Sequence, residues 1–244
     1  AWAPDTYEGA PTPVTAFLAV GPKIAAVAVM ARIFIEAFGA QAATWQPMLA
    51  VLAALTMTVG NVAAVLQTSA KRMLAYSSVA HAGYMMLGFI AMDSFGIGLA
   101  SVLFYSAAYL FMNMGAFYTL LLLRRDGLAC ENVDDFAGLS RRAPFHAFAM
   151  LMFLLSLTGI PVTAGFFGKF FLFGAALEKG FIWLLVIAAL NTVVSLYYYM
   201  RIVLAMYFKE PDGKVQIEAP FSLRLALAIS LLGTLGLGLF PEPF

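Results

Sequence analysis

The sequence predicts an all-α protein that crosses a membrane several times, and three observations support this fold class. Apolar residues make up 63% of the 244 residues and charged residues only 11%, against about 25% charged in an ordinary soluble domain. The apolar residues form continuous runs, long enough for helices that span hydrocarbon with about 20 residues each. These runs lack the period-two alternation of a transmembrane β-barrel. We therefore predict a polytopic bundle of transmembrane helices.

Seven apolar runs qualify as spans, and charges, prolines or glycines bound them. They cover residues 13–38, 47–67, 73–92, 97–123, 145–176, 181–208 and 221–240. The first follows the proline-rich "EGAPTPV" and ends before Gly39, and the second begins at Pro47. The third follows Lys71 and Arg72, and "DSFG" provides the turn to the fourth.

The fifth run differs from the others in length and content. It follows the longest polar loop, residues 124–144, whose charges of both signs place that loop outside the bilayer. From 145 to 176 the run has 32 residues, about ten more than a straight crossing needs. It contains "SLTGIPVTAGFFGKFFLF", in which Gly159 and Pro161 interrupt the helical pattern. We predict a discontinuous helix near residues 156–173. The polar "KEPDGKVQIEAP" separates the sixth and seventh runs.

The loop cations predict the orientation of the chain. If the spans alternate in direction, eight loop cations face one side of the membrane, and only Lys179 lies in a loop on the other side. The eight are Lys71, Arg72, Arg124, Arg125, Arg141, Arg142, Lys209 and Lys214. By the positive-inside rule, this predicts a cytoplasmic start and a periplasmic end of the chain.

Several classes of function lack support in the sequence. Cys130 is the only cysteine and there are two histidines, so we predict neither an intrachain disulfide nor a metal, haem or iron-sulfur site. No P-loop, dinucleotide fingerprint or hydrolytic triad is visible, and a net charge of +1 does not point to nucleic acid as a partner. The chain begins at Ala1 without a visible signal peptide, which is compatible with a piece of a longer chain.

Some charged residues lie within the predicted spans, and their positions separate anchors from functional candidates. Arg32 and Glu36 are one helical turn apart near a span end, where they can pair and reach the interface. Arg201 lies six residues from the inner end of its span and can extend to the interface as well. These three are interpreted first as anchors.

Lys23 and Lys169 lie deep in their apolar runs, where a charge costs at least about 2.5 kcal/mol. Around Lys169, glycine and proline free backbone groups that hydrocarbon cannot satisfy, and broken helices mark ion sites in transporters. Partial desolvation disfavours the charged form of a lysine. We therefore interpret Lys169 as a group that takes up and releases a proton. The alternative is that each lysine only holds two helices together.

His81 is the third candidate for proton transfer. In "YSSVAHAGY", Ser77, His81 and Tyr84 share one helical face, and imidazole titrates near physiological pH. A histidine bonded only for packing is the alternative. Other polar residues recur at helical spacing: Thr58, Asn61, Tyr105, Tyr109, Asn113, Asn191, Ser195 and Tyr198. Each alone is typical of interhelical hydrogen bonding, but together with Ser77, Tyr84 and Arg201 they predict a hydrated path that links the ionisable residues.

Four motifs occur in order and carry a family resemblance: "WAPDTYEGAPTPVTAFLAVGPKIA", "GNVAAVLQTSAKRMLAYSSVAHAGY", "SLTGIPVTAGFFGKF" and "SLYYYMRI". With them the chain resembles the antiporter-like membrane subunits of the proton-pumping NADH-quinone oxidoreductase, respiratory complex I. The segment "PDTYEGAPTPV" favours the subunit N family. Its sister subunits and the Mrp-type sodium/proton antiporters share the more general "KRMLAYSS" and "GKF" patterns.

The resemblance implies an antiporter-like fold. Family members have fourteen spans with two inverted five-helix repeats, each containing a broken helix. The seven spans here would be the C-terminal half, so residues 1–244 form one transmembrane domain and residues 47–208 one repeat. By motif, Lys23 matches the lysine of the family's eighth helix and Lys169 that of its broken twelfth helix, while His81 falls in the tenth. The first half would carry a glutamate on the fifth helix and a lysine on the seventh.

For function, the resemblance implies a proton-translocating subunit of a bacterial inner membrane, coupled to quinone reduction elsewhere in the complex. NADH, flavin, iron-sulfur clusters and quinone would belong to other subunits, with no redox chemistry in this chain. Its partners would be other membrane subunits of complex I, its own N-terminal half and the lipid bilayer. Two alternatives stay open: a sodium/proton antiporter subunit without redox coupling, and a structural scaffold whose lysines only pin helices.

Overall fold

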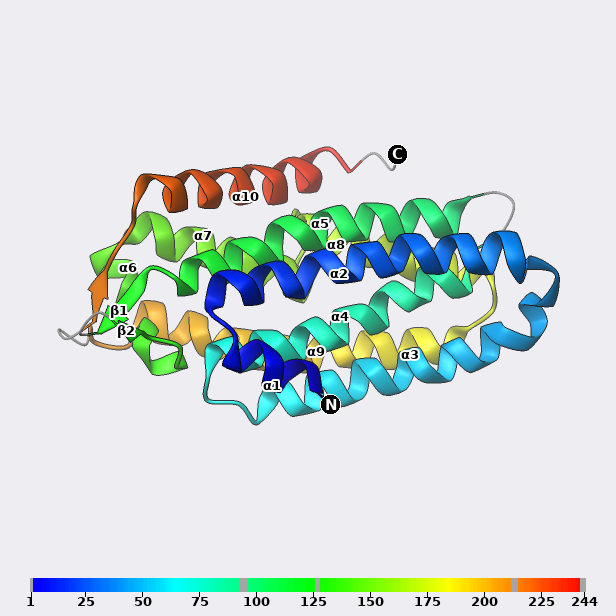
Figure 1. Ribbon diagram of the computed structural model, residues 1–244, viewed down its shortest axis with the longest axis horizontal. Helices are drawn as coiled ribbons and strands as arrows, with labels where there is room; N and C mark the ends of the chain where they lie inside the picture. The colour runs from blue at the N-terminus through cyan, green and yellow to red at the C-terminus, as the bar shows by residue number, and fades with distance from the viewer. Residues whose placement is uncertain (1, 93–95, 126–127, 212–214, 242–244) are drawn as a thin grey trace.

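A computed structural model describes residues 2–92, 96–125, 128–211 and 215–241, which form a bundle of helices running along one long axis (Figure 1). The long helices are α2 (Thr12–Arg32), α3 (Ala42–Val65), α4 (Ala70–Ile90), α5 (Ile97–Leu120), α7 (Pro144–Thr158), α8 (Ala164–Glu178), α9 (Ile182–Phe208) and α10 (Phe221–Leu239). The short elements are α1 (Trp2–Gly9), a π-helical turn (Ile33–Ala37), two 3-10 turns (Gly39–Gln41 and Val133–Phe136), α6 (Leu139–Arg142), and strands β1 (Leu123–Arg125), β2 (Leu128–Ala129) and β3 (Gln216–Ile217).

The predicted membrane bundle is confirmed. In the part of the chain that the structure describes, six helical segments are long and apolar enough to cross a bilayer. Helices α7 and α8 form the predicted discontinuous helix, interrupted between Thr158 and Ala164. The second span begins at Ala42 rather than at the predicted Pro47, because this proline lies inside α3 instead of at its start. Of the predicted features, Lys214 and the first three residues of "DSFG" lie outside the described residues.

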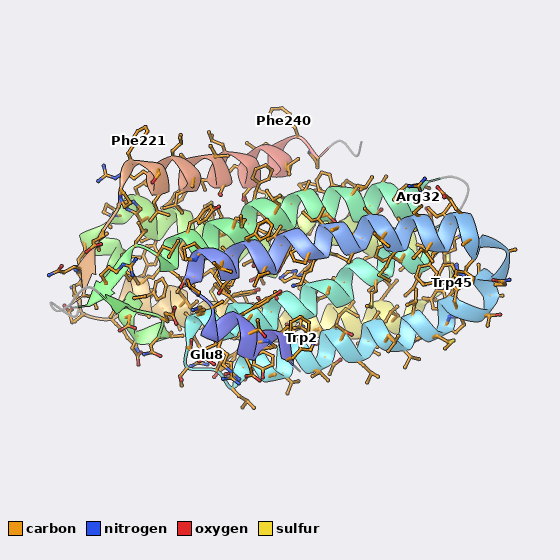
Figure 2. The ribbon with its side chains drawn as sticks, in the orientation of Figure 1. Trp2, Glu8, Arg32, Trp45, Phe221 and Phe240 are labelled. Atoms are coloured by element: carbon orange, nitrogen blue, oxygen red, sulfur yellow. The ribbon has the colours of Figure 1, made fainter. Side chains whose placement is uncertain are left out.

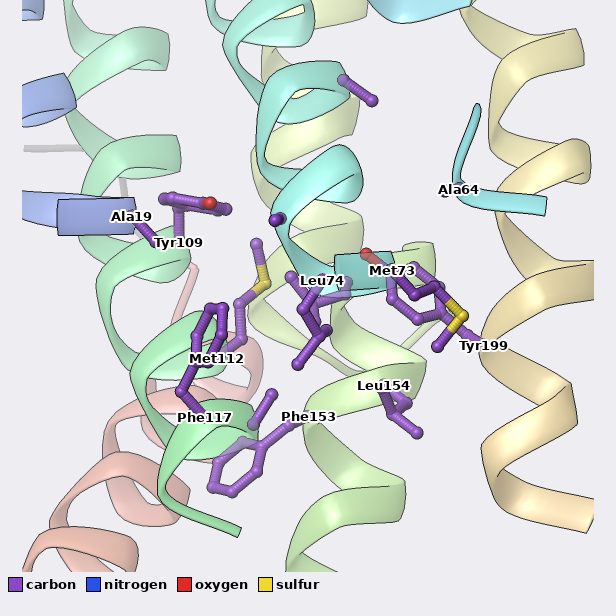
Figure 3. Close-up of a cluster of buried hydrophobic side chains, with 14 of the residues drawn as sticks. Ala19, Ala64, Met73, Leu74, Tyr109, Met112, Phe117, Phe153, Leu154 and Tyr199 are labelled. Carbon is purple, nitrogen blue, oxygen red and sulfur yellow. The ribbon is translucent and has the colours of Figure 1, made fainter. Parts of the chain in front are cut away.

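Helix α4 occupies the centre of the bundle. In its most apolar window 78% of the residues are buried, against 28% in that of α10, which covers one side (Figure 1). A cluster of buried side chains packs between the helices around α4, and Figure 3 shows it with Leu74, Met112, Phe117 and Phe153. This packing fixes α5 and α7 against the helix that carries His81.

The charged loops gather at one end of the bundle. There β1 pairs antiparallel with both β2 and β3, in the order β2-β1-β3, and this joins the loops that follow α5 and α9. Ion pairs add further links at this end: Arg72 with Asp5 and Glu8, Arg141 with Glu210 at 2.8 Å, and Lys209 with Asp134 at 2.6 Å. Arg72, Arg141 and Lys209, three of the eight loop cations expected on one side, thus lie at the same end of the bundle.

Lys71 is buried at this end, in the first turn of α4, although it was predicted to lie in a loop. It is 3% exposed, and its Nζ donates to Glu131 Oε1 at 2.8 Å and to the carbonyls of Glu8 and Ala10. The hydroxyl of Thr12 donates to the same Glu131 oxygen at 2.8 Å. These contacts hold α1 and the start of α2 against α4 and the polar loop.

Replacing Glu131 by glutamine is expected to lower the free energy of unfolding by about 2 kcal/mol, because it leaves the buried ammonium of Lys71 without its counter-charge. Thermal denaturation of the purified protein measures this loss. Glu210→Gln is the matched control, because Glu210 and its partner Arg141 have side chains 81% and 58% exposed and exposed pairs contribute little. Equal effects of the two substitutions would contradict the role given to Lys71.

Candidate functional site

The interruption between α7 and α8 supplies the hydrogen-bond acceptors of Lys169. Helix α7 ends at Thr158 and is followed by Gly159, whose φ of +90° is a backbone conformation that favours glycine. A helix end leaves carbonyl groups without intrahelical partners. The Nζ of Lys169, a residue 4% exposed, donates to the carbonyls of Leu157 at 3.1 Å and Thr158 at 2.8 Å. The broken helix therefore solvates the ammonium group in place of water.

Tyr84 lies between Lys169 and His81. The Nζ of Lys169 stands 4.6 Å from the centre of the Tyr84 ring, and the rings of Tyr84 and His81 are 5.8 Å apart. An aromatic face stabilises a nearby cation, by about 2 kcal/mol when both are desolvated. The hydroxyl of Tyr84 lies 3.4 Å from that of Thr192. Tyr84 is thus fixed in position by α9 while its ring faces the lysine.

His81 uses both of its ring nitrogens. Nδ1 lies 2.5 Å from the hydroxyl of Tyr105 and Nε2 lies 3.3 Å from that of Tyr199, in an environment that leaves the residue 2% exposed. A neutral imidazole has one donor and one acceptor nitrogen, so one hydroxyl donates and the other accepts. Because tyrosine can do either, the proton of His81 can occupy either nitrogen without losing a partner.

Lys23 completes the arrangement from α2. Its Nζ donates to the carbonyl of Ser78 at 2.5 Å and stands 5.4 Å from the centre of the Tyr109 ring. The ring of Tyr109 is in turn 5.1 Å from that of His81. The order in space is therefore Lys23, Tyr109, His81, Tyr84, Lys169, with one tyrosine on each side of the histidine. We call these five residues the central row.

The other polar residues predicted for the hydrated path lie outside the central row. A second polar cluster joins α3 to α9, in which the Tyr198 hydroxyl donates to Asn61 and the two amides of Asn61 and Asn191 bond at 3.1 Å. Asn191 also donates to Thr58. The hydroxyls of Ser77 and Ser195 bond to backbone carbonyls of their own helices, those of Leu74 and Thr192.

Arg201 and the pair Arg32 and Glu36 lie away from the central row. Arg201 donates to the carbonyls of Val65 and Gln67 at 3.0 Å, so it caps the end of α3. Arg32 pairs with Glu36 at 3.2 Å, with side chains 78% and 65% exposed, and Figure 2 shows Arg32 at the opposite end of the bundle from Glu8.

Three polar side chains of α5 near the central row lack hydrogen-bond partners within the described part of the chain. They are Ser106, Tyr109 at its hydroxyl, and Asn113 at both amide atoms. Their spacing of three and four residues puts them on one face of α5. Buried polar groups almost always have a partner, and water supplies it where protein does not. This face is therefore suited to hold water beside Lys23 and His81.

Sequence reasoning missed Tyr199 and Thr192, which contact His81 and Tyr84. It selected Asn191, Ser195 and Tyr198 on α9, although Thr192, Ser195 and Tyr199 follow the helical spacing equally well. The consecutive tyrosines of "SLYYYMRI" left the choice between two faces open. Only the packing of α9 against α4 decides that Tyr199 meets the histidine.

Comparison with protein families and known proteins gives consistent matches. The family described as "NADH:quinone oxidoreductase/Mrp antiporter, TM" matches residues 1–195. The chain is 50% identical over 242 residues to NADH-quinone oxidoreductase subunit N 1 of Solibacter usitatus, covering 98% of this chain and 49% of that protein. It is 47% identical over 244 residues to subunit N of Trichlorobacter lovleyi, covering 99% and 49%. The chain thus spans about half the length of these relatives.

Solved structures share the fold. A chain of respiratory complex I from Thermus thermophilus with bound aureothin matches with a TM-score of 0.85 and 37% identity, over 98% of this chain and 52% of that chain. A chain of the Mrp complex from Dietzia sp. DQ12-45-1b matches with a TM-score of 0.86 over the same shares, at 22% identity, which supports likeness of fold alone.

Proposed function

Because the chain belongs to the NADH:quinone oxidoreductase/Mrp antiporter transmembrane family, we propose that it relays protons within an antiporter-like subunit of NADH-quinone oxidoreductase. Relatives of 42% to 50% identity carry the name of subunit N of that enzyme, which favours this role over sodium/proton antiport without redox coupling. The chain spans about half of those relatives, so the proposal concerns its part in the whole subunit.

The central row is the observation that carries this proposal. His81 lies between two tyrosines, each of which faces one lysine ammonium group. A histidine that serves only packing would need only one hydrogen bond. A lysine that only holds two helices together would not need His81 on the far side of the neighbouring tyrosine ring. Here three groups able to gain and lose protons share one row, in which His81 and Lys169 are buried and Lys23 is partly buried.

The relay follows from electrostatics. Charges of the same sign repel strongly where the effective dielectric constant is low, so a proton on His81 raises the free energy of a proton on either lysine. A proton that arrives at Lys23 therefore favours release from the other members of the row. Water held on the polar face of α5, together with the hydroxyls of Tyr105 and Tyr199, would carry the proton between them. The amine nitrogen of Lys169 would take up the proton, and the carbonyls of the broken helix would stabilise the ammonium group that forms.

The rest of the proposal concerns the setting. We assign NADH oxidation, flavin, iron-sulfur and quinone chemistry to other subunits, which would be partners of this chain together with its own N-terminal half. Residues 47–208 would be one five-helix repeat. The end of the bundle that gathers the loop cations would face the cytoplasm of a bacterial inner membrane, in line with the positive-inside rule.

His81→Gln in the complete complex tests the relay. Glutamine keeps hydrogen bonds to tyrosine but does not titrate, so NADH-driven proton uptake into sealed vesicles is expected to fall about tenfold or more. His146→Gln is the matched control, because it removes the other histidine, at the start of α7, outside the central row.

Unchanged proton uptake in an assembled His81→Gln complex would contradict the relay and support the scaffold interpretation. The same assay in sodium-free buffer separates the two transport functions. Uptake that persists without sodium supports the proposal, whereas uptake that requires sodium supports the antiporter alternative.

A further inference from the structure

A pocket of about 380 Å³ lies at the polar end of the bundle, where α5 ends and α10 begins. Tyr118, Leu121, Pro220 and Leu223 form much of its wall, and Arg124 and Glu218 supply charges. Figure 1 shows the chain passing from β3 into α10 at this end. The pocket therefore lies at the boundary between apolar helices and charged loops, which is the depth of a phospholipid headgroup.

The two charges in the pocket face each other without closing into a hydrogen bond. Arg124 Nε and Glu218 Oε2 are 4.0 Å apart, with side chains 31% and 59% exposed. Two other pairs at the same end are tighter, with Arg141 and Glu210 at 2.8 Å and Lys209 and Asp134 at 2.6 Å. Backbone hydrogen bonds hold Arg124 and Glu218 in place. Arg124 is opposite Gln216 in the sheet, and the Glu218 amide donates to the Leu122 carbonyl at 2.8 Å.

We propose that this pocket binds the headgroup of phosphatidylethanolamine, with Arg124 contacting the phosphate and Glu218 contacting the ammonium group. A separated pair of opposite charges is complementary to a zwitterion whose phosphate and ammonium are two carbon atoms apart. Guanidinium and phosphate form strong charge-assisted hydrogen bonds, and a primary ammonium donates to a carboxylate in the same way.

Other common headgroups fit less well. Phosphatidylglycerol brings a negative charge without a positive one, so the Glu218 carboxylate would face an anion without compensation. The trimethylammonium group of phosphatidylcholine has no N–H to donate. The charge pattern thus selects the zwitterion with a free ammonium group.

Helix α10, which forms part of the pocket wall, also carries exposed apolar side chains outside the pocket that acyl chains would contact. On α10, Phe221 is 80% exposed and Leu225 is 50% exposed, and Figure 2 shows Phe221 pointing away from the bundle. Glu218 and α10 lie beyond residues 1–195, the segment that the family matches. Arg124, in contrast, lies within that segment. None of the residues that form the pocket belongs to the central row, so the site does not depend on the proposed proton relay.

Photolabelling of the complete complex tests the proposal. The complex is reconstituted in vesicles with equal amounts of phosphatidylethanolamine and phosphatidylglycerol, one of which carries a diazirine on the first carbons of an acyl chain. Labelled peptides are mapped by mass spectrometry. We expect the phosphatidylethanolamine probe to label peptides that contain residues 118–124 and 218–226 more strongly than the phosphatidylglycerol probe does.

Two substitutions are expected to lower labelling by phosphatidylethanolamine but to change labelling by phosphatidylglycerol in opposite directions. Arg124→Gln is expected to lower labelling by both probes about tenfold, because a charge-assisted hydrogen bond is lost. Glu218→Gln is expected to lower labelling by phosphatidylethanolamine and raise labelling by phosphatidylglycerol. Arg141→Gln and Glu210→Gln are the matched controls, from a closed ion pair at the same end, and should change neither signal.

Several results would overturn the lipid site. They are equal labelling by the two probes in the unsubstituted protein, labelling that neither Arg124→Gln nor Glu218→Gln changes, and no labelling at all because a protein segment covers the pocket. If Arg124→Gln prevents assembly, the change of lipid preference in Glu218→Gln decides the question, since the Glu218 side chain is more than half exposed.

Discussion

Replacing Lys169 by alanine in the complete complex is expected to slow NADH-driven proton uptake into sealed vesicles by at least about tenfold. Loss of a positioned proton-transfer group costs about 100-fold at the step it serves. The structure gives Lys169 two carbonyl acceptors from the end of α7 and an aromatic face from Tyr84, so alanine removes one of the two lysines that end the central row. Fluorescence quenching of a pH-sensitive dye measures the uptake.

Lys179→Ala is the matched control for this substitution, because Lys179 follows the same helix α8 but is exposed beyond its end. It should leave proton uptake unchanged. Normal uptake in an assembled Lys169→Ala complex would remove Lys169 from the relay.

Lys169→Arg separates charge from proton exchange at the same position. Arginine keeps its charge in proteins, so it can preserve the electrostatic contact with the broken helix but cannot release a proton. We expect uptake as low as in the alanine variant, with near-normal assembly. Full uptake with arginine would show that deprotonation of this residue is unnecessary, and would favour a fixed charge that only pins helices.

Replacing Gly165 by alanine is expected to give the largest loss of stability, about 3 kcal/mol. A Cβ atom at this position would lie 1.8 Å from the backbone oxygen of Ser156, which no side-chain movement can relieve. The Gly165 amide N–H also donates a hydrogen bond to the Ser156 hydroxyl at 3.0 Å, which joins α8 to α7 across the interruption. The added methyl group would therefore separate α7 from α8, and the thermal unfolding midpoint of the complex should fall.

Gly174→Ala is the control on the same helix. A Cβ atom at Gly174 would meet nothing within 4 Å, so alanine should leave the unfolding midpoint unchanged or raise it slightly through its better helix propensity. Equal unfolding midpoints for the two alanine variants would show that the contact between α7 and α8 tolerates an extra methyl group. Gly165→Ala should also reduce proton uptake, because the same contact positions the acceptors of Lys169.

The sequence by itself determined the membrane bundle, the approximate spans and the interruption before Lys169. These features depend on local properties: apolar runs of fixed length, and the backbone restrictions of Gly159 and Pro161. Predictions from local properties were wrong for two residues, because proline can lie inside a helix as well as at its start and lysine can be buried as well as exposed in a loop. Pro47 lies within α3 instead of starting it, and Lys71 is buried within α4 instead of lying in a loop.

Only the tertiary structure decided which side chains meet. Helical spacing puts Ser77, His81 and Tyr84 on one face, but it does not determine that Tyr84 stands between the histidine and Lys169, or that Tyr199 rather than Tyr198 reaches His81. Short elements such as α1 and the three strands also lack a periodic signal long enough to predict. The physical reason is that periodicity shows only which residues share one face of a helix, whereas contacts between helices far apart in the sequence depend on how all the helices pack together.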